Sequence, residues 1–162
     1  MILGRSEILE KVAEGKIIEE FEEACLESAG YDLRAGAFFR IEGNTKIGKD
    51  ERTLPSIDEV DLDTILLEPD DYILVRTIEK VNMPHDVAAR VLNRSSIFRS
   101  GCSVLTAFVD PGFQGQLTFG LRNLSKHSFT VEKGARLAQI VFEEVRGDTV
   151  PYTGRYQGGK VV

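Results

Sequence analysis

An aspartate in a tight turn, directly before an alternating strand, is the feature of this sequence that most resembles a catalytic group. The turn runs from Asp110 to Gly115 as Asp-Pro-Gly-Phe-Gln-Gly, and the strand from Gln116 to Leu121. Period-two alternation gives an apolar face (Leu117, Phe119, Leu121) and a second face (Gln116, Thr118, Gly120). We expect catalytic groups on the second face, which offers no carboxylate to pair with Asp110. A lone Asp in a Pro-Gly turn is usually structural, so its role depends on its neighbours.

A second cluster, Asn93 to Arg99, combines two hydroxyls with two arginines at a possible helix start. Arg94 and Arg99 supply charge and fork geometry for phosphate oxygens, and Ser95 and Ser96 supply further donors. The alternative is a capped turn with solvated arginines.

Two further polar residues stand in strand-like runs. Asp32, within Ala29 to Ala35, is a turn-capping group or a site residue, and the pattern does not decide between them. Gln139 shares a face with Leu137 and Val141, so we expect its amide to be buried and to bind backbone or a ligand.

The C-terminal arm, residues 147–162, is rich in glycine and poor in apolar residues. Its two tyrosines, two cations and amide suit a lid over a nucleotide, and a disordered tail is the alternative.

The elements that must position these groups are mostly short strands. We expect a helix over 6–14, capped by Ser6 and stopped by Gly15. Strands are predicted over 28–41, 71–76, 87–92, 102–109, 116–122, 129–131 and 136–145, with one helical turn within 94–101. Residues 42–63 are polar and predict a surface excursion, the most mobile internal segment. This spacing favours an all-β barrel, sandwich or jelly roll in a single domain over 1–162, with 147–162 a flexible arm.

Composition narrows the function classes. The net charge of −6 argues against a general nucleic-acid binder. No apolar run approaches the ~18 residues that span a bilayer, and no secretory signal is visible, so we expect a cytoplasmic protein without a membrane partner. Cys25 and Cys102, which we expect to be buried or half-buried thiols, leave little basis for a disulfide framework or a zinc site. The His-x-Glu and Pro-Cys-x-x-Cys motifs of zinc deaminases are not present.

Taken in order, the clusters resemble the superfamily of trimeric dUTPases and dCTP deaminases. The four matching motifs are Ala29-Gly30-Tyr31-Asp32-Leu33, Arg94-Ser95-Ser96, Val109 to Gly115, and Gly134-Ala135-Arg136-Leu137-Ala138-Gln139. The resemblance implies a distorted jelly roll with a short N-terminal helix and a homotrimer with active sites at subunit interfaces. It also implies Mg²⁺ carried mainly by the triphosphate, with no metal ligand from the protein.

The resemblance also assigns roles. Asp110 matches the acid that activates the attacking water, and Phe113 matches the aromatic that packs on the deoxyribose. The remaining matched substrate-binding residues are Arg94, Ser95, Ser96, Arg99 and Gln139 at the phosphates, Val104, Leu105, Thr106 and Ala107 at the pyrimidine edge, Thr118, Phe119 and Gly120 on the strand, and Tyr152, Arg155 and Gln157 on the arm.

One position separates the two branches of the superfamily. Arg99 and the arm resemble the deaminases, whose reaction relies on a glutamate ten residues past the aspartate, where this chain has Gly120. Attack of water on C4 of cytosine needs a proton carrier beside the ring, and glycine cannot act as one. Phosphoanhydride hydrolysis does not need that group. The chain therefore resembles an archaeal-type dUTPase with a deaminase-like frame, which makes dUMP and pyrophosphate from dUTP with Mg²⁺.

Three rivals remain open. The first is a dCTP deaminase, or a bifunctional dCTP deaminase/dUTPase, with another proton carrier. The second is a non-catalytic nucleotide-binding protein, and the third a purely structural trimer.

Overall fold

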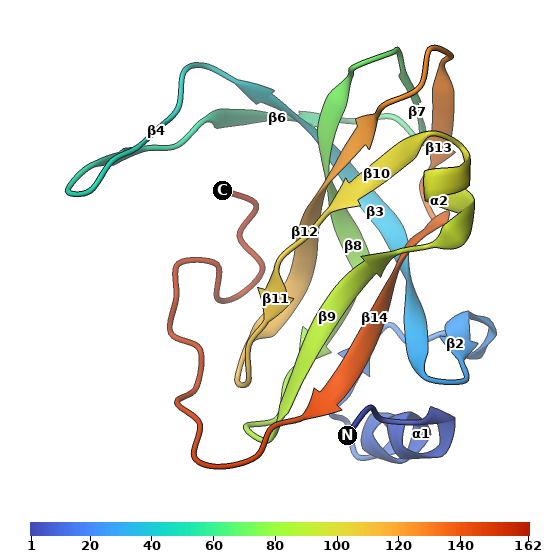
Figure 1. Ribbon diagram of the computed structural model, residues 1–162, viewed down its shortest axis with the longest axis vertical. Coiled ribbons are helices and arrows are strands. Elements are labelled where there is room, and N and C mark those ends of the chain that lie inside the picture. Colours follow the sequence, from blue (N-terminus) through green and yellow to red (C-terminus); the bar gives the residue numbers. More distant parts are fainter.

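A computed structural model describes all residues 1–162 and shows a curled antiparallel sheet with two short α-helices. Figure 1 shows the sheet closing on itself, with α1 below it, α2 at one side and the C-terminal arm along the other. The helices are α1 (Arg5–Ala13), α2 (Ser95–Arg99) and the 3₁₀ turn η1 (Glu23–Cys25). The strands are β1 (Ile17–Glu19), β2 (Leu26–Glu27), β3 (Gly30–Glu42), β4 (Lys46–Ile47), β5 (Arg52–Thr53), β6 (Ser56–Val60), β7 (Thr64–Leu67), β8 (Tyr72–Asn82), β9 (Val87–Asn93), β10 (Cys102–Leu105), β11 (Phe108–Val109), β12 (Gln114–Asn123), β13 (Phe129–Glu132) and β14 (Arg136–Glu144). The all-β jelly roll with a short N-terminal helix that the sequence predicts is confirmed.

The main sheet runs in the order β10-β12-β8-β3-β14-β9-β11, with β1, β2 and β6 pairing at its sides. Its two ends are held together by side chains. Asn93, at the end of β9, accepts a hydrogen bond from the Val104 N–H at 2.6 Å and donates to the Val104 carbonyl at 3.4 Å. The Thr106 hydroxyl donates to the Val91 carbonyl at 2.7 Å. These bonds satisfy polar groups where the ladder itself does not continue.

The interior is one apolar core, filled by the inward faces of the strands other than the β4–β5 hairpin. Its largest fully buried side chains include Tyr31, Phe38, Ile73, Leu121 and Phe142. Burial of such side chains is the main favourable contribution to folding, about 1.5–3 kcal/mol each. Both thiols are free and buried, as the sequence predicts. Neither helix has the length and apolar character that a membrane crossing requires.

The N-terminal helix begins one residue earlier than predicted, with a different cap. Gly4 is the N-cap, its N–H donates to the Glu7 carboxylate at 3.2 Å, and the helix begins at Arg5. Ser6 therefore lies inside the first turn and is not the cap. Gly15, with φ of +70°, ends the helix as predicted.

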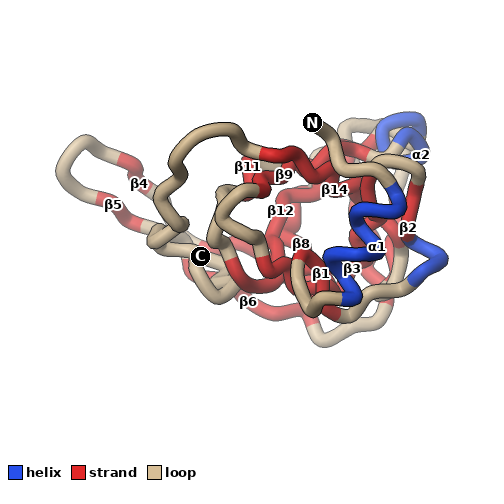
Figure 2. Tube along the Cα trace, turned by 90° about the horizontal axis from the view of Figure 1, so that it is seen from below, coloured by secondary structure: helices blue, strands red, loops and turns tan.

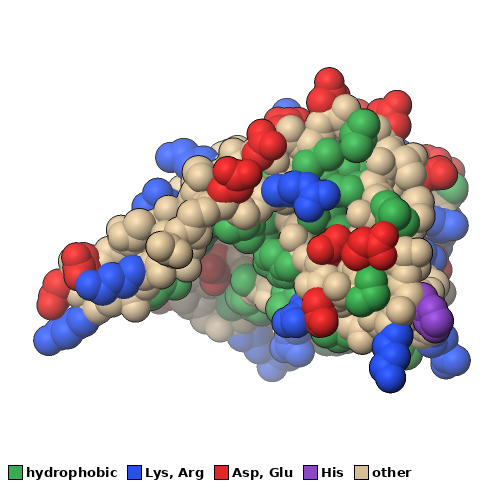
Figure 3. Space-filling model, turned by 90° about the horizontal axis from the view of Figure 1, so that it is seen from above, with side chains coloured by type: hydrophobic (Ala, Val, Ile, Leu, Met, Phe, Trp, Pro, Cys, Tyr) green, Lys and Arg blue, Asp and Glu red, His purple; other side chains and the backbone are tan.

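The excursion of residues 42–63 is more ordered than the sequence suggests. Strand β6 pairs with the outer half of β3, with Ile57 opposite Ile41, and β4 and β5 form a separate hairpin. Figure 2 shows this hairpin projecting from the barrel, and Figure 3 shows basic and acidic side chains along the projection. Both strands of the hairpin are exposed, whereas Val60 of β6 packs against the core.

Candidate active site

A pocket of about 470 Å³ lies where the β10–β11 connection, β12 and the C-terminal arm meet. Its walls come from four parts of the chain. The first is β8, with Tyr72 and Leu74, and the second is the region around β11, with residues 105–109 and the nearby Val91 of β9. The third is the turn and β12, with Asp110, Phe113 and residues 116–120. The fourth is the arm, with Tyr152, Tyr156, Lys160 and Val161. Asp110 is the one carboxylate and Lys160 the one cation in this lining.

The turn before β12 presents Asp110 to solvent at the pocket. The Phe113 N–H donates to the Asp110 carbonyl at 3.2 Å, and Gly112 takes a φ of +79° that glycine adopts without strain. Two backbone hydrogen bonds with Met83 fix the turn. The Gly112 N–H donates to the Met83 carbonyl at 3.1 Å, and the Met83 N–H donates to the Phe113 carbonyl at 2.9 Å. The Asp110 side chain is exposed, so it is free to orient a water molecule.

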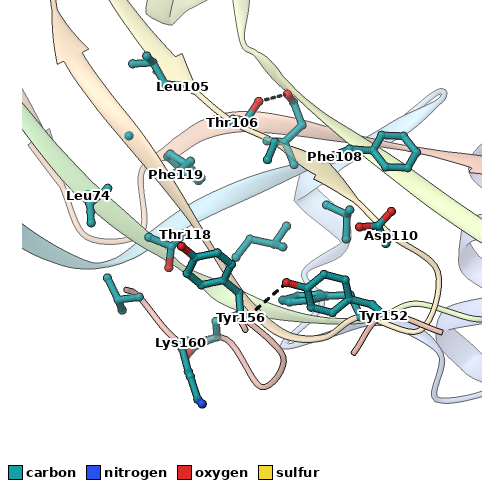
Figure 4. A pocket seen from close by; sticks show the side chains of 18 of the residues that line it. Leu74, Leu105, Thr106, Phe108, Asp110, Thr118, Phe119, Tyr152, Tyr156 and Lys160 are labelled. Carbon is teal, nitrogen blue, oxygen red and sulfur yellow. Dashed lines mark hydrogen bonds between the residues drawn. The ribbon is translucent and has the colours of Figure 1, made fainter. Parts of the chain in front are cut away.

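Phe113 is buried beneath the arm and meets Tyr152 edge-to-face, with ring centroids 5.6 Å apart. The Tyr152 hydroxyl accepts a hydrogen bond from the Tyr156 N–H at 3.3 Å. In Figure 4, Asp110 lies on the Tyr152 side of the pocket, and Thr118 lies beside Tyr156 on the other. The two tyrosines therefore cover the pocket from the arm.

Gln157 fastens the arm to the turn rather than lining the pocket. Its amide accepts from the Gln114 N–H at 2.9 Å and donates to the Gly112 carbonyl at 3.0 Å. A side-chain carbon at Gly115 would lie 2.6 Å from the Gly158 carbonyl carbon, so the two backbones touch there. Arg155 is exposed and does not reach the pocket.

The second face of β12 lies along the pocket, which Leu117 and Phe119 of the apolar face also line. The Thr118 hydroxyl is buried in the pocket wall and has no hydrogen-bond partner within the chain, so it is available to a ligand. Gly120 is buried against the ring of Tyr72 on β8.

The connection over residues 104–107 reaches the pocket only in part. Leu105, Thr106 and Ala107 line it, whereas Val104 lies in the core with both of its backbone groups bonded to Asn93.

The phosphate-binding residues expected from the sequence lie elsewhere, in a group we call the arginine cluster: Asp32, Arg94, Arg136 and the neighbouring α2 residues. The Asp32 carboxylate is buried, 2.9 Å from Arg94 Nε and 3.5 Å from an Arg136 nitrogen. Burial raises the pKa of Asp32, and the two guanidinium groups act in the opposite direction. Arg94 also donates to the Arg136 carbonyl at 3.0 Å.

Ser95, Ser96 and Arg99 are exposed on α2, and none of them lines the pocket. Gln139 is half-buried, which corrects the expectation that its amide is buried. The reason is a bulge in β14 between Arg136 and Ala138, which turns Ala138, Ile140 and Phe142 to the core instead. Gln139 also does not line the pocket, so one chain carries two separate groups of candidate site residues.

Several lining residues have no assignment from the sequence. Tyr156 and Lys160 belong to the arm, whose composition singles it out. Phe108 stands two residues before Asp110 but carries no signal of its own, and Tyr72 and Leu74 are brought to this side only by strand register.

Comparison with known proteins gives the family. Residues 2–145 match the family model described as "dCTP deaminase-like". The chain is 36% identical over 151 residues to a dCTP deaminase of Thermococcus kodakarensis, covering 93% of this chain and 90% of that one. It is 35% identical over 142 residues to a probable deoxyuridine 5′-triphosphate nucleotidohydrolase of Methanothermobacter thermautotrophicus, covering 88% and 93%.

The structure resembles the crystal structure of 2′-deoxycytidine 5′-triphosphate deaminase from Agrobacterium tumefaciens. The TM-score is 0.69 at 22% identity, and the match covers 87% of this chain and 47% of that one, about half its length. This likeness supports the fold. With the match to the family model over most of its length, the chain belongs to the dCTP deaminase and dUTPase superfamily.

Proposed function

We propose that the protein is a dUTP diphosphatase that hydrolyses dUTP to dUMP and pyrophosphate. The observation that carries the proposal is the charge content of the pocket, in which Asp110 is the one carboxylate and position 120 is glycine. A pocket with a single acid can orient a water molecule toward phosphorus. It offers no second acid to move protons beside a cytosine ring.

In the proposed reaction, Asp110 accepts a hydrogen bond from a water molecule and aligns its oxygen with the α-phosphorus. A new P–O bond forms while the bond from the α-phosphorus to the bridging oxygen breaks. Pyrophosphate leaves in line, and the water proton passes to Asp110. Phe113 packs on the deoxyribose, the residues 105–107 face the pyrimidine, and Thr118 donates its free hydroxyl.

The donor set suits Mg²⁺ that arrives with the nucleotide. No group of three His, Cys, Asp or Glu side chains in the chain could hold a metal ion. Magnesium keeps several waters and binds substrate phosphates, so an ion carried by the triphosphate needs no ligand from this chain. Bound there, Mg²⁺ would neutralise charge on the triphosphate.

The separation of the two groups of residues supports a homotrimer. None of the residues of the arginine cluster lines the pocket of its own chain. A neighbouring copy could bring Arg94, Ser95, Ser96, Arg99 and Gln139 to the triphosphate, with Arg155 of the arm free to join them. Closed symmetric assemblies place such repeated half-sites together at each interface.

A dCTP deaminase, alone or combined with dUTP hydrolysis, is the second candidate. It is favoured by the names of relatives such as the Thermococcus kodakarensis protein. The test is to incubate the protein with Mg²⁺ and dUTP or dCTP and to follow pyrophosphate and ammonia together. Pyrophosphate from dUTP without ammonia from dCTP supports the diphosphatase. Ammonia from dCTP supports the deaminase, and binding of dUTP without either product supports a nucleotide-binding protein.

A further inference from the structure

Tyr72 occupies the space that a side chain at position 120 would need. A carbon added to Gly120 would lie 2.6 Å from Tyr72 Cε2 and 2.7 Å from Cζ, with the hydroxyl oxygen closer still. These separations are shorter than any van der Waals contact between carbons. With the ring in this position a side chain at 120 has no room, and admitting one would require the ring of Tyr72, which is 39% exposed, to move. The two residues therefore form a matched pair.

Strand register explains the pair. In the β8–β12 ladder, Tyr72 lies opposite Arg122 and Gly120 lies opposite Leu74. Tyr72 and Gly120 are thus diagonal neighbours on one face, within reach of an aromatic ring. On the other side of Gly120 stands Leu105 of β10.

Together Tyr72, Leu74, Leu105 and Gly120 form what we call the base end of the pocket. Leu105 begins the stretch that faces the pyrimidine in the proposed function. Figure 4 shows Leu74 and Leu105 on the side of the pocket away from Asp110. The ring of Tyr72 therefore limits the room where the base would lie.

The state of the Tyr72 hydroxyl argues against a role as proton carrier. It makes no hydrogen bond within the chain, and burial raises the pKa of the phenol above its usual value. The hydroxyl stays protonated at neutral pH and is a poor base there. A ring covering a strand glycine also has a purely structural use, in supporting the sheet.

We propose that Tyr72 is a specificity-determining residue, whose ring closes the base end over Gly120, limits the size of the base admitted and leaves no room for an acid at that position. The proposal rests on the proposed function for the identity of the nucleotide. It assigns the discrimination between pyrimidines to a side chain outside the four sequence motifs.

The experiment compares Tyr72→Leu, Tyr72→Phe, Gly120→Ala and the double variant Tyr72→Leu/Gly120→Ala. For each, pyrophosphate release gives kcat/KM with dUTP, dCTP and dTTP, and thermal unfolding gives Tm. Phe108→Leu is the matched control, because Phe108 is an exposed aromatic beside Asp110 in the same pocket.

Tyr72→Leu is expected to lower the preference for dUTP over dTTP at least tenfold, while Tyr72→Phe and Phe108→Leu change that preference less than threefold. Gly120→Ala is expected to lower kcat/KM for dUTP at least tenfold, and adding Tyr72→Leu is expected to restore most of it. A Tyr72→Leu protein with lower Tm and the wild-type preference would overturn the proposal, since a structural role predicts that result. Purely multiplicative effects in the double variant would overturn it as well.

A wild-type protein that releases no pyrophosphate from dUTP would contradict the proposed function instead. The pair is then tested by Kd for α,β-imido-dUTP and α,β-imido-dTTP, for which the same tenfold change in preference is expected. An unchanged ratio of these Kd values in Tyr72→Leu would overturn the inference independently of hydrolysis.

Discussion

The pocket and the arginine cluster differ in where each places its charge. The pocket is wide and mostly apolar, with an exposed Asp110 and an unpartnered Thr118 hydroxyl. The arginine cluster is compact, and its central acid, Asp32, is buried between two guanidinium groups. One region has free groups and space, while the other has charge already ordered by internal partners. Under the proposed function, nucleotide recognition and phosphate binding would therefore be built separately on this chain.

The largest effect we expect concerns the pocket. Asp110→Asn should lower kcat for dUTP by about 10³-fold, because the amide no longer accepts the water proton. Binding of α,β-imido-dUTP, measured by calorimetry, should change less than threefold. Lost binding with preserved residual turnover would show that Asp110 holds the nucleotide instead. Asp148→Asn, an exposed acid on the arm outside the pocket lining, is the control.

In the arginine cluster, we expect loss of the central acid to lower the stability of the fold. Asp32→Asn leaves Arg94 and Arg136 facing each other without the acid, and we expect a loss of about 2 kcal/mol in the free energy of unfolding. We place this below the value for fully buried pairs because the Arg136 side chain is 41% exposed. Asp70→Asn is the matched control, because Asp70 pairs with Arg122 but its side chain is 83% exposed. We expect this change to lower the free energy of unfolding by less than about 0.5 kcal/mol. Urea denaturation measures both, and equal losses would contradict the prediction.

Mixing two variants, each damaged in one region, tests whether the pocket of one chain and the arginine cluster of another chain form one site. Asp110→Asn damages the pocket, and Arg99→Ala damages the expected phosphate group without touching the Asp32 ion pairs. If each site combines the two regions from different copies, co-refolding equal amounts should return roughly a quarter of wild-type activity. Activity that stays at the level of the separate variants would place both regions of a site on one chain.

The smallest effect concerns pH. Tyr31 is buried and donates to Glu79 at 3.3 Å, and burial, as the main cause, raises the pKa of Tyr31 strongly. Above pH 10 the unfolded chain releases this proton while the folded chain keeps it, so stability should fall as pH rises, by up to about 1.4 kcal/mol per pH unit. Urea denaturation at pH 9, 10 and 11 should show a shallower decline in Tyr31→Phe than in wild type. An identical decline would assign the alkaline loss to other groups.

Sequence patterns predict much of this architecture, and they fail where a polar group stands in a core position. The predicted strand ends at Arg76, although β8 continues to Asn82. The continuation carries Thr77 and Glu79 on its inward face, both fully buried. Glu79 is bound by Arg34, and Thr77 donates to the Glu79 carbonyl at 2.7 Å. Alternation of apolar and polar residues cannot anticipate polar groups that are satisfied by distant strands.

In the candidate site too, some positions follow from local sequence and others depend on contacts between distant strands. Asp110, Phe113 and Thr118 follow each other along the chain, so local pattern and motif suffice to bring them together. The bulge in β14 adds one residue without any mark in the sequence, so the face of Gln139 differs from the one that simple alternation predicts. Tyr72 carries no signal in the sequence, because its position beside Gly120 depends on the register between β8 and β12. Long-range register therefore limits what can be read from one sequence.

The contact between Gly115 and the arm at Gly158 and Gly159 has a practical consequence. Two stretches of backbone meet there without side chains between them, and a carbon added to Gly159 would lie 2.7 Å from the Gln116 nitrogen. A single methyl group at that contact would push the two backbones apart and move the arm, with Tyr152 and Tyr156, away from the pocket, while Asp110 and Thr118 stay in place. The contact thus offers a way to prepare a permanently uncovered form of the protein, suited to soaking nucleotides into crystals.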